Sequence, residues 1–197
     1  MLKKHLIIFA KNPRIGRVKT RLARDMGKVG AWGFYRQMLS RIPARLAKKG
    51  PWETYLSYSP DHSLTKIFPA KKCGFLKQGA GDLGDRMFRP KDRLKPGPFV
   101  IIGTDIPDIK PSHIKKAFKL LGKNDVVFGP CDDGGFWLVG LKRHPIITDP
   151  YQQSVRWSHE ETLNDCLKNL KSKKVAFLES LEDIDTFDDL KRWRENR

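Results

Sequence analysis

The stretch PFVIIGTD (98–105) is the clearest strand in the sequence, and it decides the fold class. Its continuous apolar run is typical of a strand that is covered on both faces, as in a parallel sheet. A similar short run, HLIIFA (5–10), lies near the start of the chain, and strand-like segments alternate with helical ones from there onward. This alternation predicts an α/β fold of three layers (α/β/α), in which a mostly parallel sheet lies between helices.

Periodicity and turn residues place the other elements. Alternating or continuous apolar runs predict further strands at 53–59, 74–78, 125–130, 135–141 and 174–180. A long helix is expected from about Val18 to Gly50, broken near Gly27 and kinked or split at Pro43. Shorter helices are expected near 81–88, after a proline at 111, after a capping box in SHEE (158–161) and after a cap in TFDD (186–189). The charged segment RPKDRLKPGP (89–98) is expected to be a mobile surface loop.

Composition limits the class of protein. The 197 residues suffice for one domain, 1–197, with a real core. The chain has 39 Lys and Arg against 22 Asp and Glu, a formal net charge of +17, and a pI near 9.9. This balance favours a polyanion, an anionic membrane surface or a phosphorylated small molecule as partner.

Cysteine usage and the N-terminal run bear on the compartment. Cys73, Cys131 and Cys166 form no CxxC pair, which argues against a zinc ribbon or a thioredoxin-like motif. They are expected to be reduced thiols in a cytoplasmic protein. The apolar run 6–10 is too short for a signal sequence or a membrane span, while a peripheral contact with an anionic membrane stays open.

A basic, glycine-containing loop follows the first expected strand in NPRIGRVKTRLA (12–23). Gly16 allows close backbone approach, and the helix expected after it would offer unpaired N–H groups. Arg17, Lys19 and Arg21 add charges, and arginine can grip phosphate oxygens in a bidentate fork. The loop therefore predicts a phosphate cradle, although a solvated helix start would show the same residues. It is not a Walker A loop.

Carboxylates follow several later strands, where ligands gather in open α/β sheets. In GTDIPD (103–108), Asp105 stands at the end of a strand and could bind Mg²⁺ with substrate phosphates, whereas Asp108 better fits a helix cap. GPCDDGGFWLVGL (129–141) places two carboxylates and two glycines before a strand, which suits close approach of a ligand. EDIDTFDDL (182–190) adds Asp183 and Asp185 before the last helix.

Six motifs occur in order along nearly the whole chain and resemble a bacterial family. They are FAKNPRIGRVKTRLA, QGAGDLGDRMF, IGTDIPDI, GPCDDGGFWLVGL, VRWSHEETL and EDIDTFDDL. The set resembles the DUF2064, or glycosyltransferase-A-like, family, which is related to phospholactate guanylyltransferase and to the molybdenum-cofactor nucleotidyltransferases. The resemblance implies a nucleotide-diphospho-sugar transferase fold, a nucleotide substrate and Mg²⁺ or Mn²⁺.

The resemblance also implies roles for single residues. Asp105 and Asp185 would bind the metal, and Asp132 and Asp133 would be catalytic on the acceptor or sugar side. The substrate-binding residues would be Gly16, Arg17, Lys19, Arg21, Gln78, Asp82, Gly134 and Gly135. Arg17 and Val18 stand where the nucleotidyltransferases usually have a second glycine, and D-x-x-D stands where many glycosyltransferases have D-x-D.

These observations predict an enzyme that transfers a group from a nucleotide-sugar to an acceptor. Nucleotidyl transfer, of a guanylyl or cytidylyl group with release of pyrophosphate, is the first alternative. A non-catalytic nucleotide- or RNA-binding module is the second. Specific nucleic-acid recognition is disfavoured, because carboxylates at the other strand ends would repel a polyanion and no groove-binding element is visible.

Overall fold

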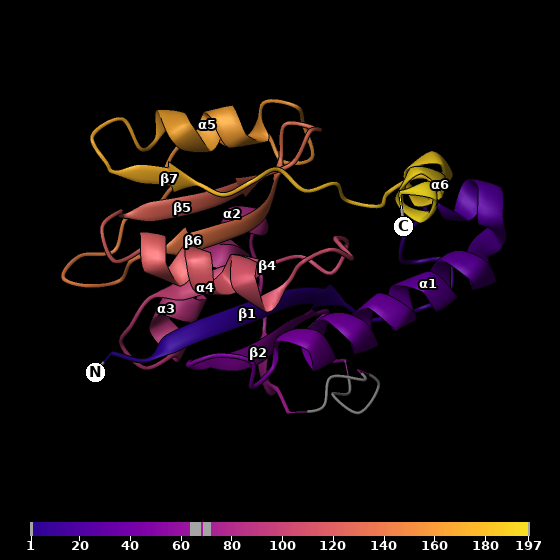
Figure 1. Cartoon of the computed structure of the whole chain (residues 1–197), viewed down its shortest axis with the longest axis horizontal. Coiled ribbons are helices and arrows are strands. Elements are labelled where there is room, and N and C mark those ends of the chain that lie inside the picture. Colours follow the sequence, from indigo (N-terminus) through magenta and orange to yellow (C-terminus); the bar gives the residue numbers. More distant parts are fainter. Residues whose placement is uncertain (1, 64–67, 69–71, 197) are drawn as a thin grey trace.

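The chain folds around one seven-stranded sheet. The computed structural model in Figure 1 describes residues 2–63, 68 and 72–196. The strands are β1 (Lys4–Lys11), β2 (Trp52–Ser59), β3 (Gly74–Lys77), β4 (Phe99–Ile102), β5 (Val126–Pro130), β6 (Phe136–Leu141) and β7 (Val175–Phe177). Their order across the sheet is β3-β2-β1-β4-β6-β5-β7. Only β6 runs antiparallel to its neighbours β4 and β5, so the sheet is mixed and mostly parallel, as predicted.

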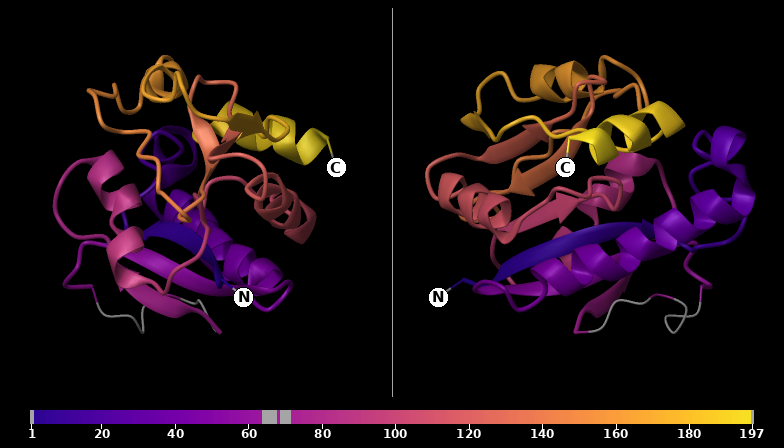
Figure 2. Two further views of the ribbon diagram at one scale, coloured as in Figure 1. Left: turned by 90° about the vertical axis from the view of Figure 1, so that its left-hand side faces the viewer. Right: turned by 45° about the vertical axis from the view of Figure 1, so that its right-hand side comes forward.

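Helices cover both faces of the sheet. They are α1 (Ala23–Leu46), α2 (Leu83–Phe88), α3 (Pro90–Arg93), α4 (Pro111–Leu120), α5 (Thr162–Lys168) and α6 (Phe187–Glu195). The left-hand view of Figure 2 shows α2 and α3 on one side of the sheet and α4 and α6 on the other. None of the helices within the described residues is both long enough and apolar enough to cross a membrane.

Alternation along β1 explains the three layers. Leu6 and Ile8 point into the core shared with α1 and α4, while Ile7 points into the core shared with α2 and α5. All three side chains are fully buried. A strand buried on both faces needs apolar residues at every position, which is the continuous run seen in the sequence. The three-layer α/β prediction is therefore confirmed.

Helix α1 departs from the expected bounds. The break at Gly27 is present, with φ +76°. The helix begins at Ala23 instead of near Val18. It also continues through Pro43 to Leu46, so of the two outcomes expected at this proline, a kink or a split, the split is wrong. Pro43 lies in the last turn, where it removes only one intrahelical hydrogen bond.

Two other local expectations are wrong. The capping box in SHEE does not form, because Ser158 has a φ of +57° and the N-cap position of α5 is Glu161, whose side chain makes no cap hydrogen bond. The Thr162 hydroxyl lies 2.6 Å from the His159 carbonyl and 2.7 Å from the Arg156 carbonyl, and it organises this turn in place of the capping box. Segment 89–98 contains α3, and its buried Leu94 offers a carbonyl to Arg143 at 3.2 Å, so it is a packed segment and not an open loop.

Candidate functional site

The strand order creates a topological switch point at one edge of the sheet. β1 pairs with β2 on one side and with β4 on the other, so the chain leaves β1 and β4 in different directions. In open α/β sheets, ligands bind outside the carboxyl ends of the strands at such a switch point. The loop after β1 carries Lys19, and the loop after β4 carries Asp105.

Lys19 joins these loops through two carboxylates. Its Nζ lies 2.7 Å from Asp185 Oδ1 and 3.2 Å from Asp105 Oδ2. Arg21 Nη1 lies 3.5 Å from the second oxygen of Asp185. These four residues, Lys19, Arg21, Asp105 and Asp185, form what we term the Lys19 cluster. It unites the predicted phosphate-binding cations with the two predicted metal ligands.

Lys19 is buried, whereas the two carboxylates that it contacts are partly exposed. Its side chain is 6% exposed, while those of Asp105 and Asp185 are 39% and 38% exposed. Burial tends to lower the pKa of Lys19, but the two carboxylates outweigh it and the pKa is raised above its ordinary value. Lys19 is therefore a cation at neutral pH, and both carboxylates still face solvent.

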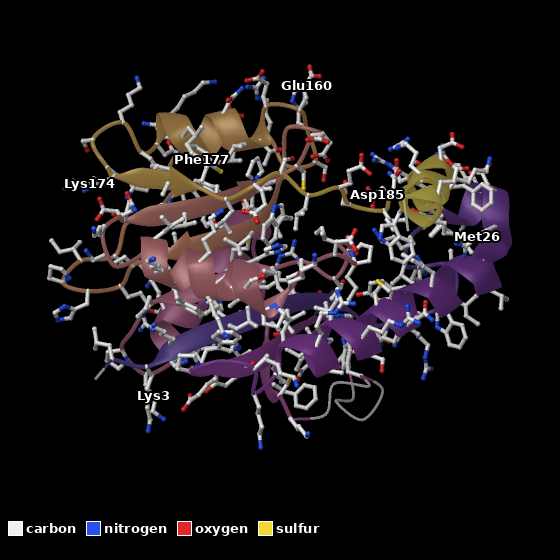
Figure 3. The ribbon with its side chains drawn as sticks, viewed as in Figure 1. Lys3, Met26, Glu160, Lys174, Phe177 and Asp185 are labelled. Atoms are coloured by element: carbon white, nitrogen blue, oxygen red, sulfur yellow. The ribbon has the colours of Figure 1, made fainter. Side chains whose placement is uncertain are left out.

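Asp185 reaches the cluster because the chain after β7 crosses the sheet edge. Backbone N–H groups of Leu178, Leu181 and Ile184 donate in turn to carbonyls of Phe128 (2.8 Å), Pro130 (3.3 Å) and Asp105 (3.0 Å). Figures 1 and 3 show this segment running from β7 to α6, with Asp185 just before the helix. The predicted cap of α6 is confirmed: Thr186 and Asp189 form a capping box.

More carboxylates surround the cluster. Burial raises the pKa of Asp183 to about 6, and the negative charges of Asp185 and Asp133 add to this effect. Burial also raises the pKa of the Cys131 thiol, with Asp183 contributing, so this cysteine stays protonated. Asp183 was noted in the sequence only as part of an acidic pair. No local signal marks it as partly buried.

The two predicted catalytic carboxylates have structural partners. Asp133 Oδ1 accepts from the Gly135 N–H at 2.9 Å and shapes the turn before β6. Asp132 accepts from the Ser180 hydroxyl at 2.6 Å. The side chains of Asp132 and Asp133 are exposed. Their catalytic role stays a prediction.

Gly134 is required for packing. Its φ is +83°, and a Cβ there would lie 1.8 Å from the carbonyl oxygen of Glu160. This approach brings the start of α5 against the turn, and the Leu163 N–H donates to the Gly134 carbonyl at 3.0 Å. The glycine is explained without a ligand, so its predicted role in substrate binding is not needed to account for it.

The predicted cradle has a different backbone from the one expected. Gly16 has a φ of +72°, Lys19 has a φ of +48°, and Arg17 is exposed between them. Because α1 begins only at Ala23, and the Ala23 N–H donates to the Lys19 carbonyl at 2.9 Å, the loop is not followed at once by free helical N–H groups. Phosphate binding here would depend mainly on side chains.

Gln78 and Asp82 lie along the same sheet edge, beyond β2. Gln78 is buried and donates to the carbonyls of Ser57 (2.9 Å) and Ala10 (3.3 Å), which pins β2 to β1. Asp82 caps α2 and accepts from the Trp157 indole at 3.1 Å. It also lines a cavity of about 210 Å³. Among the residues that the structure describes, neither side chain forms a hydrogen bond or ion pair with Lys19.

Two supporting contacts were not expected. The Tyr35 hydroxyl accepts a hydrogen bond from the Lys11 N–H at 2.7 Å. Burial raises the pKa of this tyrosine, and the negative charge of Asp105 raises it further. Asp108, expected to cap a helix, instead accepts from the Trp193 indole at 3.0 Å and so tethers α6. In the sequence, Tyr35 is one of the apolar residues with helical spacing in α1, and nothing there predicts the contacts of its hydroxyl.

The carboxylates suit a divalent cation that shares its shell with a substrate. Within the described ranges, no three His, Cys, Asp or Glu side chains are grouped to hold a metal by themselves. Asp105 and Asp185, however, both reach one cation, the Lys19 ammonium. Mg²⁺ is commonly bound by one or two protein carboxylates, with water and substrate phosphates completing the shell. The residues present fit that arrangement.

Comparison with known proteins identifies the family. The model of the family DUF2064, described as "Uncharacterized protein conserved in bacteria", matches residues 42–159, more than half of the chain. The chain belongs to this family. A search of curated proteins finds no match.

Solved structures share the fold. A protein of Desulfovibrio desulfuricans G20, provisionally classed as a nucleotide-diphospho-sugar transferase, has 28% identity and a TM-score of 0.89, over 100% of this chain and 89% of that one. CMP:2-keto-3-deoxy-manno-octonic acid synthetase complexed with CTP has 12% identity and a TM-score of 0.63, over 98% of each chain. Glucosyl-3-phosphoglycerate synthase of Mycobacterium tuberculosis, in complex with Mn²⁺, UDP and phosphoglyceric acid, has 8% identity and a TM-score of 0.59, over 93% and 71%. The predicted nucleotide-diphospho-sugar transferase fold is therefore confirmed.

Proposed function

We propose that this chain, acting as one domain, is a metal-dependent transferase that uses a nucleotide-sugar donor. The observation that carries the proposal is the Lys19 cluster, which places two cations and two carboxylates at the switch point of the sheet. A nucleotide-sugar offers a diphosphate that needs cations, and it is commonly bound together with a divalent metal that needs carboxylates. The similarity to the D. desulfuricans protein supports the same class.

The chain's own residues would bind the diphosphate. Lys19 and Arg21 would donate to its oxygens, and the positive φ at Gly16 lets the backbone of the loop turn toward them. Asp105 and Asp185 would hold Mg²⁺ or Mn²⁺. When bound, the metal supplies positive charge to the leaving nucleoside diphosphate.

The acceptor would lie on the side of the turn before β6. Asp133 would orient the acceptor hydroxyl and take its proton while the new glycosidic bond forms and the bond to the diphosphate breaks. Asp132 and the backbone at Gly135 would contact the sugar or the acceptor. Gln78 and Asp82 would contact the substrate further along the edge.

Nucleotidyl transfer is the second candidate. Two cations beside two carboxylates also suit a nucleoside triphosphate with its metal. The CMP:2-keto-3-deoxy-manno-octonic acid synthetase was solved with CTP on a similar fold. In this reaction the phosphorylated or carboxylated acceptor would attack the α-phosphate, and pyrophosphate would leave. A non-catalytic nucleotide- or RNA-binding module would bind without either product.

Ligand binding is tested first by thermal shift with nucleotides and nucleotide-sugars, with and without Mn²⁺. A ligand at about 100 times its Kd stabilises a protein by roughly 2.7 kcal/mol, which is several degrees for a domain of this size. Asp105→Asn should abolish the Mn²⁺-dependent part of the shift, because the amide lacks the charge that a hard cation needs. Asp188→Asn, which removes an exposed carboxylate from α6, is the matched control.

Product analysis then separates the reactions. Slow release of nucleoside diphosphate from a nucleotide-sugar, suppressed in Asp133→Asn, supports glycosyl transfer to water in place of the acceptor. Pyrophosphate from a nucleoside triphosphate, without nucleoside diphosphate, supports nucleotidyl transfer and contradicts the first proposal. Confirmed binding with neither product over a broad panel leaves the non-catalytic module.

A further inference from the structure

The positive charge of the chain is concentrated in one segment. Residues 11–49 contain twelve Lys and Arg and one acidic residue, Asp25, so this fifth of the chain has a formal charge of +11 out of +17. The segment comprises the loop after β1 and nearly all of α1. Only Lys19 and Arg21 take part in the Lys19 cluster, so most of this charge has no role in the proposed reaction.

The loop and the helix form one surface. The Trp32 indole donates to the Pro13 carbonyl at 2.6 Å. Gly16 lies against Lys28, because a Cβ on this glycine would sit 3.5 Å from Lys28 Cδ. The Arg36 guanidinium lies over the Trp32 ring, 5.0 Å from its centre. These contacts hold the loop along the N-terminal half of α1.

Two large aliphatic side chains project from this surface. Ile15, beside Gly16, is 53% exposed, and Val29, beside Lys28, is 66% exposed. Their exposed basic neighbours complete a patch that we term the basic ridge: Arg14, Ile15, Arg17, Lys28, Val29 and Arg36. The α1 residues that face the core, such as Phe34 and Met38, are buried on the other side of the helix.

We propose that the basic ridge docks the protein on the surface of a bilayer that contains anionic phospholipids. Lysine and arginine near such a surface are attracted by its negative potential, and the attraction falls off within a Debye length. Apolar side chains amid basic ones enter the boundary between headgroups and acyl chains, where they gain from burial. The ridge offers both features on one face and bears no acidic side chain.

Nucleic acid is the competing polyanion, and the ridge suits it less well. Single-stranded nucleic acid is bound by basic grooves that also provide aromatic side chains for stacking. The one aromatic residue at the ridge, Trp32, has its ring under Arg36 and its N–H bound to Pro13. Ile15 and Val29, in contrast, gain nothing from a phosphate backbone.

Docking would also orient the candidate site. Arg17 belongs to the ridge and stands two residues before Lys19. The Lys19 cluster would therefore lie close to the bilayer surface. The docking proposal itself does not depend on the reaction that the site performs.

Flotation with vesicles tests the proposal. The full chain is mixed with vesicles of phosphatidylcholine alone, or with about 30% phosphatidylglycerol, at about 0.1 M and about 0.5 M NaCl. We expect binding only to the anionic vesicles and a steep loss at the higher salt. The triple variant Arg14→Gln/Arg17→Gln/Lys28→Gln should bind about a hundredfold more weakly, and Ile15→Ser/Val29→Ser roughly tenfold more weakly.

Matched controls separate docking from net charge. Lys171→Gln/Lys173→Gln/Lys174→Gln removes the same charge from exposed positions just before β7; Figure 3 labels Lys174 at the opposite end of the molecule from Met26 of α1. Ile146→Ser removes an aliphatic side chain that is 75% exposed elsewhere. Both controls should bind like the unmodified chain, and circular dichroism checks that every variant folds.

Three results would overturn the proposal. One is the absence of binding to anionic vesicles at low salt. Another is an equal loss in the two triple variants, which would indicate a nonspecific charge effect. The last is unchanged binding by Ile15→Ser/Val29→Ser together with tighter, ridge-dependent binding to a single-stranded RNA oligonucleotide, which would assign the ridge to nucleic acid.

A blue shift of an environment-sensitive dye on Ile15→Cys with anionic vesicles would support insertion directly.

Discussion

Replacement of Lys19 by methionine separates the contacts inside the Lys19 cluster from contacts with ligands. Methionine keeps much of the length and the apolar stem but removes the ammonium that lies 2.7 Å from Asp185 and 3.2 Å from Asp105. A buried charge-assisted hydrogen bond contributes about 1.5–3 kcal/mol, whereas an exposed ion pair contributes about 0–1 kcal/mol. Because both carboxylates are more than a third exposed, we expect the variant to lose about 1–2 kcal/mol of unfolding free energy.

The same change should alter ligand binding in two opposite directions. Without the ammonium, Asp105 and Asp185 face each other with no cation between them, so Mn²⁺ alone should stabilise the variant more than the unmodified chain. A nucleoside di- or triphosphate should bind roughly ten- to a hundredfold more weakly, because a phosphate contact of about 1.5–3 kcal/mol is lost. Nucleoside without phosphate should be unaffected.

Thermal unfolding and isothermal titration measure both effects. A change of 1 kcal/mol shifts the Tm of a domain of this size by about 2–4 °C, so the variant should melt about 2–8 °C lower in the absence of ligand. Lys115→Met, an exposed lysine on α4, is the control. An Mn²⁺ response equal to that of the unmodified chain would show that Lys19 does not compete with the cation. Unchanged nucleotide affinity would remove Lys19 from the cradle.

Three further outcomes follow from single sites. Gly134→Ala should destabilise the fold by about 2 kcal/mol or more in denaturant unfolding, because the new Cβ meets the carbonyl of Glu160; Gly33→Ala, with no atom within 4 Å, should be neutral or stabilising. Burial lowers the pKa of His5 in the folded chain, so the unfolded chain binds a proton at His5 more readily. The contribution of His5 to the unfolding free energy should therefore be fully present above about pH 6.5 and be lost as the pH falls. His5→Gln should flatten this decline in pH-dependent melting curves. Arg21→Ala should weaken nucleoside diphosphate binding by about tenfold and leave nucleoside binding unchanged, since equal losses would mean that Arg21 supports the fold.

Features that depend on neighbours in the chain could be predicted from the sequence. The continuous run 6–10 and its counterpart at 99–102 specify strands because every position is apolar and all but the half-buried Phe9 are buried. Thr186 and Asp189 lie three residues apart and satisfy each other's backbone at the start of α6. Gly27 interrupts its helix with a φ that other residues rarely adopt.

Features that depend on contacts outside the motif itself could not be predicted in this way. Segment 89–98 has the composition of a loop, yet Arg143 holds it through carbonyls of Leu94 and Lys95 from about fifty residues away. The motif SHEE has the residues of a capping box, but the Thr162 hydroxyl lies against the carbonyls of His159 and Arg156 instead, and the backbone follows that turn. In segment 89–98 a long-range contact outweighs the local preference, and in SHEE a competing turn around Thr162 does so.

The candidate site also depends on contacts between residues that are far apart in the sequence, and these contacts affect how ligands would bind. The sequence predicts phosphate as the partner of Lys19, and the family resemblance implies a metal as the separate partner of Asp105 and Asp185. The fold brings these residues together across 166 positions, so each satisfies the other before any ligand arrives. A metal alone would meet the ammonium of Lys19, and a phosphate alone would meet two carboxylates. We therefore expect the metal and the nucleotide to bind best together, because the phosphate would draw Lys19 away while the cation would neutralise the carboxylates. Titration of Mn²⁺ in the presence and absence of nucleotide should show this coupling as tighter binding of each when the other is present.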